Sequence, residues 1–180
     1  FCIITWIIKD ILLFNLIVFF ISILLGFFLL NFPKGYIFFC FLGAYLCGFL
    51  LAIISVMLPS RNAEISSWIS LLICLYPISE TIFSIYRKYK RIGHDPSKPD
   101  GIHLHMLIYR NLSRIVSNKL NIKNYRNSIT SIIMWIYPLL SCLMAILTLY
   151  ESNLTIIMFF LFMLFYLLSY RKVSLNWKKN

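Results

Sequence analysis

Long runs of apolar residues alternate with short polar breaks along the chain. A helix crosses a bilayer when about 20 consecutive residues are predominantly apolar. Runs of about this length lie at residues 11–32, 36–58, 65–85, 128–150 and 153–170. Each of them predicts a membrane-spanning helix. Residues 1–8 are also apolar but too short to cross, and we expect them to be a partial span, the end of a helix that begins before Phe1.

The breaks between the runs carry residues that end helices or turn the chain. Proline lacks an amide donor and disfavours helix in the residue before it. The breaks lie at Lys9-Asp10, Pro33-Lys34-Gly35, residues 59–64 and Glu151-Ser152. Because these connections are short, the pattern predicts hairpins of neighbouring spans.

Residues 86–127 form the longest stretch outside the predicted spans, and this stretch is strongly basic. Its acids are Asp95 and Asp100, and its cations are Arg87, Lys88, Lys90, Arg91, Lys98, Arg110, Arg114, Lys119, Lys123 and Arg126. Cytoplasmic loops carry an excess of Lys and Arg. We therefore expect this stretch and the basic C-terminal tail to be cytoplasmic. The alternation of spans then puts the break at Pro33 on the same side, and those at Lys9, Ser60 and Glu151 outside.

An amphipathic helix is predicted within this basic stretch. Its apolar positions recur at the spacing of one helix face, and they are Leu104, Leu107, Ile108, Leu112 and Ile115. Basic residues surround this face. A helix of this kind lies on a membrane surface with its apolar face toward the lipid.

Composition supports the same fold class. The chain is 61% hydrophobic and 13% charged, with a mean hydropathy of +0.84, whereas a soluble domain is about 25% charged. We expect an all-α, polytopic transmembrane bundle that forms a single membrane domain. The net charge of +11 then favours anionic lipids or phosphate ligands as partners rather than nucleic acid.

The cysteines do not indicate a metal site or a disulfide framework. All five lie in apolar runs without CxxC spacing, which is typical of small buried side chains. Glu80 is different, because it is an acid inside a predicted span, where carboxyl groups are costly and often functional. It either anchors the helix, against Arg87 or Lys88, or belongs to a ligand site.

Several segments together are similar to one enzyme family. They are NFP at 31–33, IFF at 37–39, GAYLCGFLLA at 43–52, RNAE at 61–64, YPISETIFSIYR at 76–87 and PDGIHLHMLIYR at 99–110. In order and spacing they resemble the C-terminal half of the polyprenyl-phosphate N-acetylhexosamine-1-phosphate transferases, bacterial multi-span enzymes related to phospho-N-acetylmuramoyl-pentapeptide transferase.

The resemblance implies transfer of a sugar 1-phosphate from a UDP-sugar to a polyprenyl phosphate at the cytoplasmic face of the bacterial inner membrane, with Mg²⁺, in cell-envelope synthesis. It assigns His103 and His105 to an HxH motif near the nucleotide sugar. It also places His94 where a basic residue is usual, and Asp100 in the loop that shapes the site. Without the resemblance, the histidines would be read as solvated side chains of a basic loop.

One position departs from the family pattern in a way that affects catalysis. Where the family has Gly-Asp, with the Asp binding the metal, this chain reads Cys40-Phe41. Mg²⁺ requires hard oxygen ligands, which neither a thiol nor a phenyl ring supplies. We therefore expect no intact catalytic site and no metal-binding residue. The family's N-terminal motifs would precede Phe1.

Two functions follow from these observations. The chain is either a truncated or inactive relative of the transferases, or a non-enzymatic integral membrane scaffold or small transport or assembly subunit. The sequence leaves open whether the chain forms a homodimer.

Overall fold

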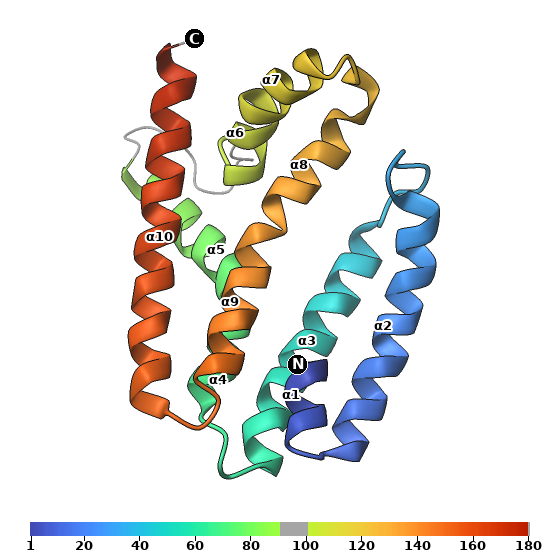
Figure 1. Cartoon of the computed structure of the whole chain (residues 1–180), viewed down its shortest axis with the longest axis vertical. Helices are drawn as coiled ribbons and strands as arrows, with labels where there is room; N and C mark the ends of the chain where they lie inside the picture. Colours follow the sequence, from blue (N-terminus) through green and yellow to red (C-terminus); the bar gives the residue numbers. More distant parts are fainter. Residues whose placement is uncertain (91–100, 180) are drawn as a thin grey trace. The chain divides into compact units, whose positions relative to one another are not determined.

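The computed structural model describes residues 1–90 and 101–179, with side chains up to residue 175 (Figure 1). This part of the chain is α-helical and contains no strand, which confirms the predicted fold class. Its elements are α1 (Cys2–Ile7), α2 (Ile11–Asn31), α3 (Phe41–Arg61), α4 (Ser67–Ile73), α5 (Leu75–Lys90), α6 (Leu104–Arg110), α7 (Leu112–Lys119), the 3-10 turn η1 (Lys123–Tyr125), α8 (Arg126–Met134), α9 (Ile136–Leu147) and α10 (Ser152–Lys179).

The described helices provide four candidate membrane spans. They are Ile11–Asn31, Phe41–Arg61, Lys123–Leu147 and Ser152–Leu175. The broken pair α4 and α5 is a fifth if it counts as one span. The chain is therefore a multi-pass membrane protein by the length and composition of its helices.

The predicted span at residues 36–58 differs from the structure in where its helix begins. Residues 36–58 were expected to form one helix, but α3 starts at Phe41 and continues through Pro59 to Arg61. Residues 36–42 are apolar throughout, so hydropathy does not indicate at which of them the helix begins. Pro59 lies in the last turn of α3, so the helix ends two residues after it.

The run 65–85 does not form the single helix that its hydropathy predicts. The helix is broken at Cys74, between α4 and α5. Pro77 follows in the first turn of α5 and has no N–H to offer to the carbonyl four residues earlier. The apolar pattern does not predict this break because the residues on both sides are apolar.

Two further predictions need correction. The amphipathic helix over 104–115 is divided into α6 and α7 at Asn111, whose φ and ψ of −102° and −82° are not helical. The last helix continues past the expected end at residue 170 to Lys179.

The described chain divides into two compact units. The first consists of Phe1–Ile73 and Cys142–Ile157, and the second of Cys74–Ser141 and Met158–Asn180. The expectation of a single membrane domain stays a prediction.

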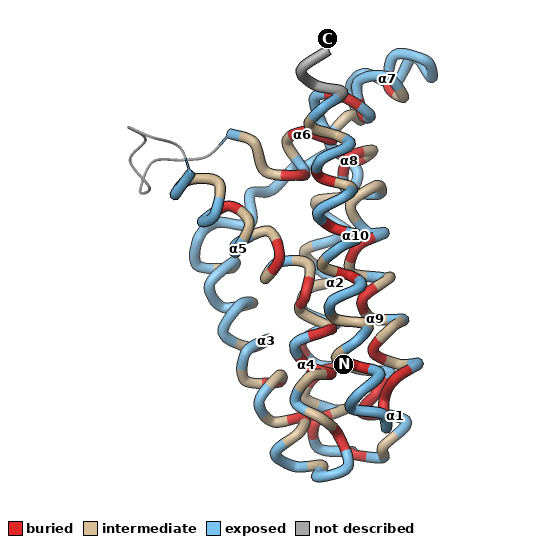
Figure 2. The backbone as a smooth tube through the Cα atoms, turned by 90° about the vertical axis from the view of Figure 1, so that its left-hand side faces the viewer, coloured by how far each residue is buried: buried red, intermediate tan, exposed pale blue. Residues whose placement is uncertain are grey.

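In the first unit, α1 packs on α2, α2 lies beside α3, and α3 contacts α4. Leu13, Ile54, Leu58 and Ile69 are fully buried or nearly so. Most other apolar side chains of α2 and α3 are exposed (Figure 2). In a membrane, lipid tails would cover these exposed faces, so their exposure is compatible with a spanning role.

A polar cluster fastens the turn between α1 and α2 to the end of α3. The Asp10 carboxylate accepts hydrogen bonds from the amide of Leu13 at 3.1 Å and from the Arg61 guanidinium at 2.9 and 3.1 Å. Asn62 donates a further bond at 3.2 Å. Asp10 therefore caps α2 and pairs with α3 at once.

In the second unit, α6 packs against α7 and α8. Leu104, Leu107 and Ile108 of α6 are completely buried or nearly so, so protein covers the apolar face that was predicted to lie toward the lipid. Leu112 and Ile115, which follow the break at Asn111, are instead exposed. The three residues thus share one face of α6 as predicted, but this face packs inside the protein rather than on a membrane surface, and it does not continue into α7.

Candidate functional site

The Glu80 carboxyl joins three helices of the second unit. Its Oε1 lies 2.8 Å from Nδ1 of His103 and accepts the amide N–H of Leu104 at 3.2 Å. Its Oε2 accepts the hydroxyl of Tyr166 at 2.7 Å. Glu80 thus links α5 to the start of α6 and to α10. The expectation that it anchors a helix is met by these partners, which differ from the expected Arg87 and Lys88.

Helix α10 also holds α6 at both ends. The Tyr170 hydroxyl donates to the carbonyl of Ile102, just before α6, at 2.9 Å. The Asn111 amide, just after α6, donates to the carbonyl of Val173 at 3.1 Å. A seven-residue helix is unstable alone, so these contacts and the burial of its apolar face account for its order.

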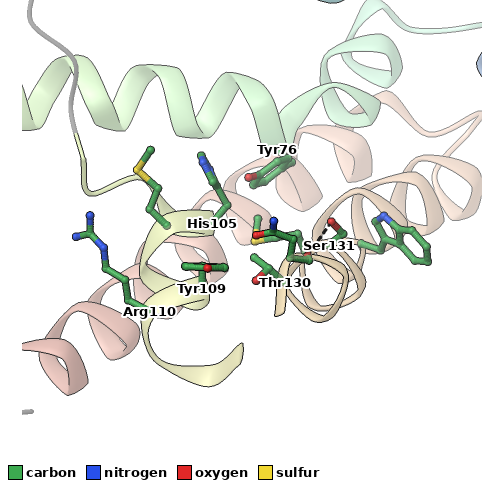
Figure 3. Close-up of a pocket in the computed structure, with 10 residues that line it drawn as sticks. Tyr76, His105, Tyr109, Arg110, Thr130 and Ser131 are labelled. Carbon is green, nitrogen blue, oxygen red and sulfur yellow. Dashed lines mark hydrogen bonds between the residues drawn. The ribbon is translucent and has the colours of Figure 1, made fainter. Parts of the chain in front are cut away.

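The exposed side of α6 lines a pocket of about 700 Å³. Small-molecule sites in proteins usually measure 300–1,000 Å³. The lining side chains come from α5, α6 and α8 and the residue that follows α8, and they are Tyr76, His105, Met106, Tyr109, Arg110, Asn127, Thr130, Ser131, Met134 and Trp135. Figure 3 shows His105 and Tyr76 close together on one side of the pocket, with Arg110 and Ser131 toward opposite ends.

Arg126 fixes the end of α6 that carries the pocket residues Tyr109 and Arg110. Its Nε and Nη2 donate to the carbonyl of Tyr109 at 2.9 and 2.6 Å, and Nη2 also reaches the carbonyl of Arg110 at 3.3 Å. Its guanidinium lies 4.1 Å from the centre of the Tyr109 ring. A cation at the last carbonyls of a helix satisfies their lone pairs and opposes the macrodipole.

The two histidines of the HxH motif occupy different surroundings. Their rings are nearly parallel, with centroids 5.8 Å apart. His103 is bonded to Glu80 and precedes α6 as its N-cap, whereas His105 lines the pocket. Partial burial lowers the pKa of His105, an effect that His103 reinforces and Glu80 opposes. At neutral pH His105 is therefore mainly a neutral ring that can donate or accept a hydrogen bond.

The remaining predicted positions cannot be joined to this pocket. His94 and Asp100 lie outside the described residues. Phe41 belongs to the first unit, and its side chain is 82% exposed. Next to it, Cys40 has a φ of +35°, in the region that favours glycine. The backbone conformation thus suits the Gly of the family pattern, although a cysteine occupies it.

The residues described do not fit the metal that the resemblance implies. A phenyl ring stands at the position of the family's carboxylate, and no described group of three His, Cys, Asp or Glu side chains could hold a metal ion. The oxygens of Asp10 and Glu80 already accept hydrogen bonds from protein groups. These residues therefore provide no site for Mg²⁺, which prefers several hard oxygen ligands.

Sequence reasoning did not identify Tyr76, Asn127 and Trp135 as pocket residues. They lie in predicted spans or at the edge of one, where aromatic and small polar residues look like ordinary helix positions. The only signal was the proximity of Tyr76 to Glu80 in the motif at 76–87.

The fold and the pocket define a class, a helical multi-pass membrane protein with a mainly apolar pocket that one histidine of the HxH motif lines. Comparisons of the chain with protein-family profiles, with curated proteins and with solved structures find no significant match.

Proposed function

We propose that this chain is a non-catalytic membrane relative of the polyprenyl-phosphate N-acetylhexosamine-1-phosphate transferases, and that it binds a UDP-sugar in the pocket between α5, α6 and α8. The observation that carries the proposal is the presence of His105 and Arg110 on one wall of a 700 Å³ pocket. An imidazole and a guanidinium are the donors that a diphosphate requires.

Aromatic side chains around these donors support a nucleotide rather than a simple anion. Tyr76, Tyr109 and Trp135 line the same pocket, and aromatic rings stack on nucleobases. The similarity of PDGIHLHMLIYR at 99–110 to the family motif favours uridine among the possible bases. The lipid partner in this proposal is polyprenyl phosphate in the bacterial inner membrane.

The proposal excludes turnover by this chain alone. Phosphoryl transfer depends on positioning and on cations that offset the developing charge. Phe41 supplies neither a carboxylate nor any other metal ligand. Purified protein given UDP-N-acetylglucosamine, undecaprenyl phosphate and Mg²⁺ is therefore expected to release no UMP, and clear UMP release would contradict the proposal.

Binding of UDP-N-acetylglucosamine to the protein in lipid nanodiscs tests the proposal directly. Calorimetric titration is expected to give saturable binding in the wild type. Arg110→Gln should weaken it by about tenfold or more, since a hydrogen bond to a charged group contributes about 1.5–3 kcal/mol. Arg114→Gln is the matched control, because Arg114 is exposed on α7 and does not line the pocket.

The scaffold alternative makes the opposite prediction. A structural membrane protein would show no saturable binding of the UDP-sugar, and Arg110→Gln would behave like Arg114→Gln. Either result would overturn the proposed function.

A further inference from the structure

The contacts of Glu80 constrain where the proton of His103 resides. Glu80 is mostly buried, with a side chain 13% exposed, and that of His103 is 28% exposed. Oε1 of Glu80 accepts the Leu104 amide and also lies 2.8 Å from Nδ1 of His103. Oε2 accepts the Tyr166 hydroxyl. The Leu104 amide and the Tyr166 hydroxyl therefore donate to this carboxyl, and Nδ1 of His103 lies at hydrogen-bond distance from it.

An ionised carboxylate has only acceptor sites. With Glu80 as a carboxylate, the short contact with Oε1 requires a proton on Nδ1 of His103. In a histidine the hydrogen bond made by one ring nitrogen determines the state of the other. With the proton on Nδ1, the neutral ring presents Nε2 as a bare acceptor.

We propose that Glu80 is a positioning residue that holds His103 in the tautomer protonated at Nδ1, so that Nε2 is the atom offered to a ligand. The inference deepens the proposed function and rests on it for the identity of the ligand, a nucleotide sugar. Its statement about the His103 ring can be tested without any ligand.

This arrangement defines what His103 can do chemically. Nε2 accepts a hydrogen bond from a ribose or sugar hydroxyl while the ring is neutral. If Nε2 takes up a proton, it becomes a donor to a phosphate oxygen, and the Glu80 carboxylate offsets the charge of the imidazolium. His105 lies parallel to this ring, with the ring centroids 5.8 Å apart, and it is the histidine of the two that lines the pocket.

Glu80 also sets the orientation of α6. Its bond to the Leu104 amide satisfies one of the N–H groups that the first turn of a helix leaves without an internal partner. His105 follows one residue later and lines the pocket. The same carboxyl therefore fixes the His103 ring and the turn that carries His105.

Nuclear magnetic resonance of ¹⁵N-labelled histidine measures the tautomer directly. The chain has three histidines, which can be assigned with His94→Gln, His103→Gln and His105→Gln. At pH 8 in nanodiscs, wild-type His103 is expected to carry its proton on Nδ1. A wild-type spectrum with the proton on Nε2 would overturn the inference without any variant of Glu80 being required.

Substitution of Glu80 provides the second test. Glu80→Met keeps the length of the side chain and removes both acceptors, so the His103 proton is expected to move to Nε2. Tyr166→Phe leaves Oε1 in place and should not change the tautomer. Glu64→Gln, which removes an exposed acid of the first unit, is the matched control. An unchanged His103 spectrum in Glu80→Met would contradict the inference.

Ligand binding separates this inference from the proposed function. Glu80→Met is expected to weaken UDP-N-acetylglucosamine binding about tenfold. If the wild type shows the Nδ1 proton but binds no UDP-sugar, the proposed function fails and the role of Glu80 stands. If the wild type binds and His103 carries its proton on Nε2, the role of Glu80 fails and the proposed function stands.

Discussion

Asp10 shows how a single side chain can organise a turn at the end of a hydrophobic helix. Its side chain is 5% exposed and its partner Arg61 is 39% exposed. Hydrogen bonds from Arg61, Leu13 and Asn62 and the charge of Arg61 outweigh the effect of burial and lower the pKa of Asp10 from 3.8 to about 2. The ionised form is therefore the one that stabilises the first unit.

Stability is expected to fall between pH 4 and pH 2 because of this residue. Above pH 4 the carboxylate is ionised in both the folded and the unfolded state, so its contribution is complete. Below pH 4 the unfolded state takes up the proton first, and the contribution is lost as pH falls toward 2. Allowing for the partial exposure of Arg61, we expect a loss of about 1 kcal/mol.

Thermal unfolding in detergent across this pH range measures the effect. Asp10→Asn keeps an N-cap oxygen but not the charge, so it should lack this part of the pH dependence. The control variant Glu64→Gln should retain the pH dependence of the wild type. If the unfolding midpoint of Asp10→Asn fell with pH as steeply as that of the wild type, Asp10 would not be the residue responsible.

At the scale of the elements, helix ends depend on residues that hydropathy does not register. Residues 36–42 are all apolar or aromatic, yet α3 begins only at Phe41. Cys40, immediately before it, has a φ of +35°. For a residue with a side chain this left-handed conformation is unfavourable in free energy, whereas glycine adopts it freely.

Cys40→Gly is therefore expected to stabilise the protein by about 1 kcal/mol. Cys47→Gly is the matched control, because Cys47 lies inside α3, where glycine costs about 1 kcal/mol relative to alanine. The midpoint of thermal unfolding in detergent should rise for the first variant and fall for the second. A lower midpoint for Cys40→Gly would show that the backbone at this position is not left-handed.

At the scale of the whole molecule, the charge pattern predicts how the chain is inserted. Lys and Arg are concentrated in 86–127 and near the C-terminus, and such segments stay in the cytoplasm. The Pro33 break should lie on that side, and the Ser60 turn on the other.

Labelling of single cysteines tests this topology. In a variant with the five native cysteines replaced by serine or alanine, Ser60→Cys is expected to react with a membrane-impermeant maleimide in intact spheroplasts. Gly35→Cys and Gly101→Cys should react only after the membrane is opened. Labelling of Gly101→Cys in intact spheroplasts would reverse the predicted orientation.

The sequence by itself determined the helical class, the apolar runs and which residues share the apolar face of α6. These features arise from the length and period of apolar residues, which depend on local composition. The span at 11–32 is found at Ile11–Asn31, and Leu104, Leu107 and Ile108 share one face of α6 as predicted, although protein and not lipid covers that face. The HxH motif also lies in the segment that lines the pocket, where His105 is one of the lining residues.

Only the tertiary structure decided which side chains meet. Glu80 and Tyr166 are far apart in sequence, and no periodicity relates them, yet they share a hydrogen bond of 2.7 Å. In the same way, the fold placed His103 against Glu80 and His105 in the pocket, although the sequence treats the two residues alike. Contacts between distant segments depend on how helices pack in three dimensions, and a one-dimensional pattern contains little information about that packing.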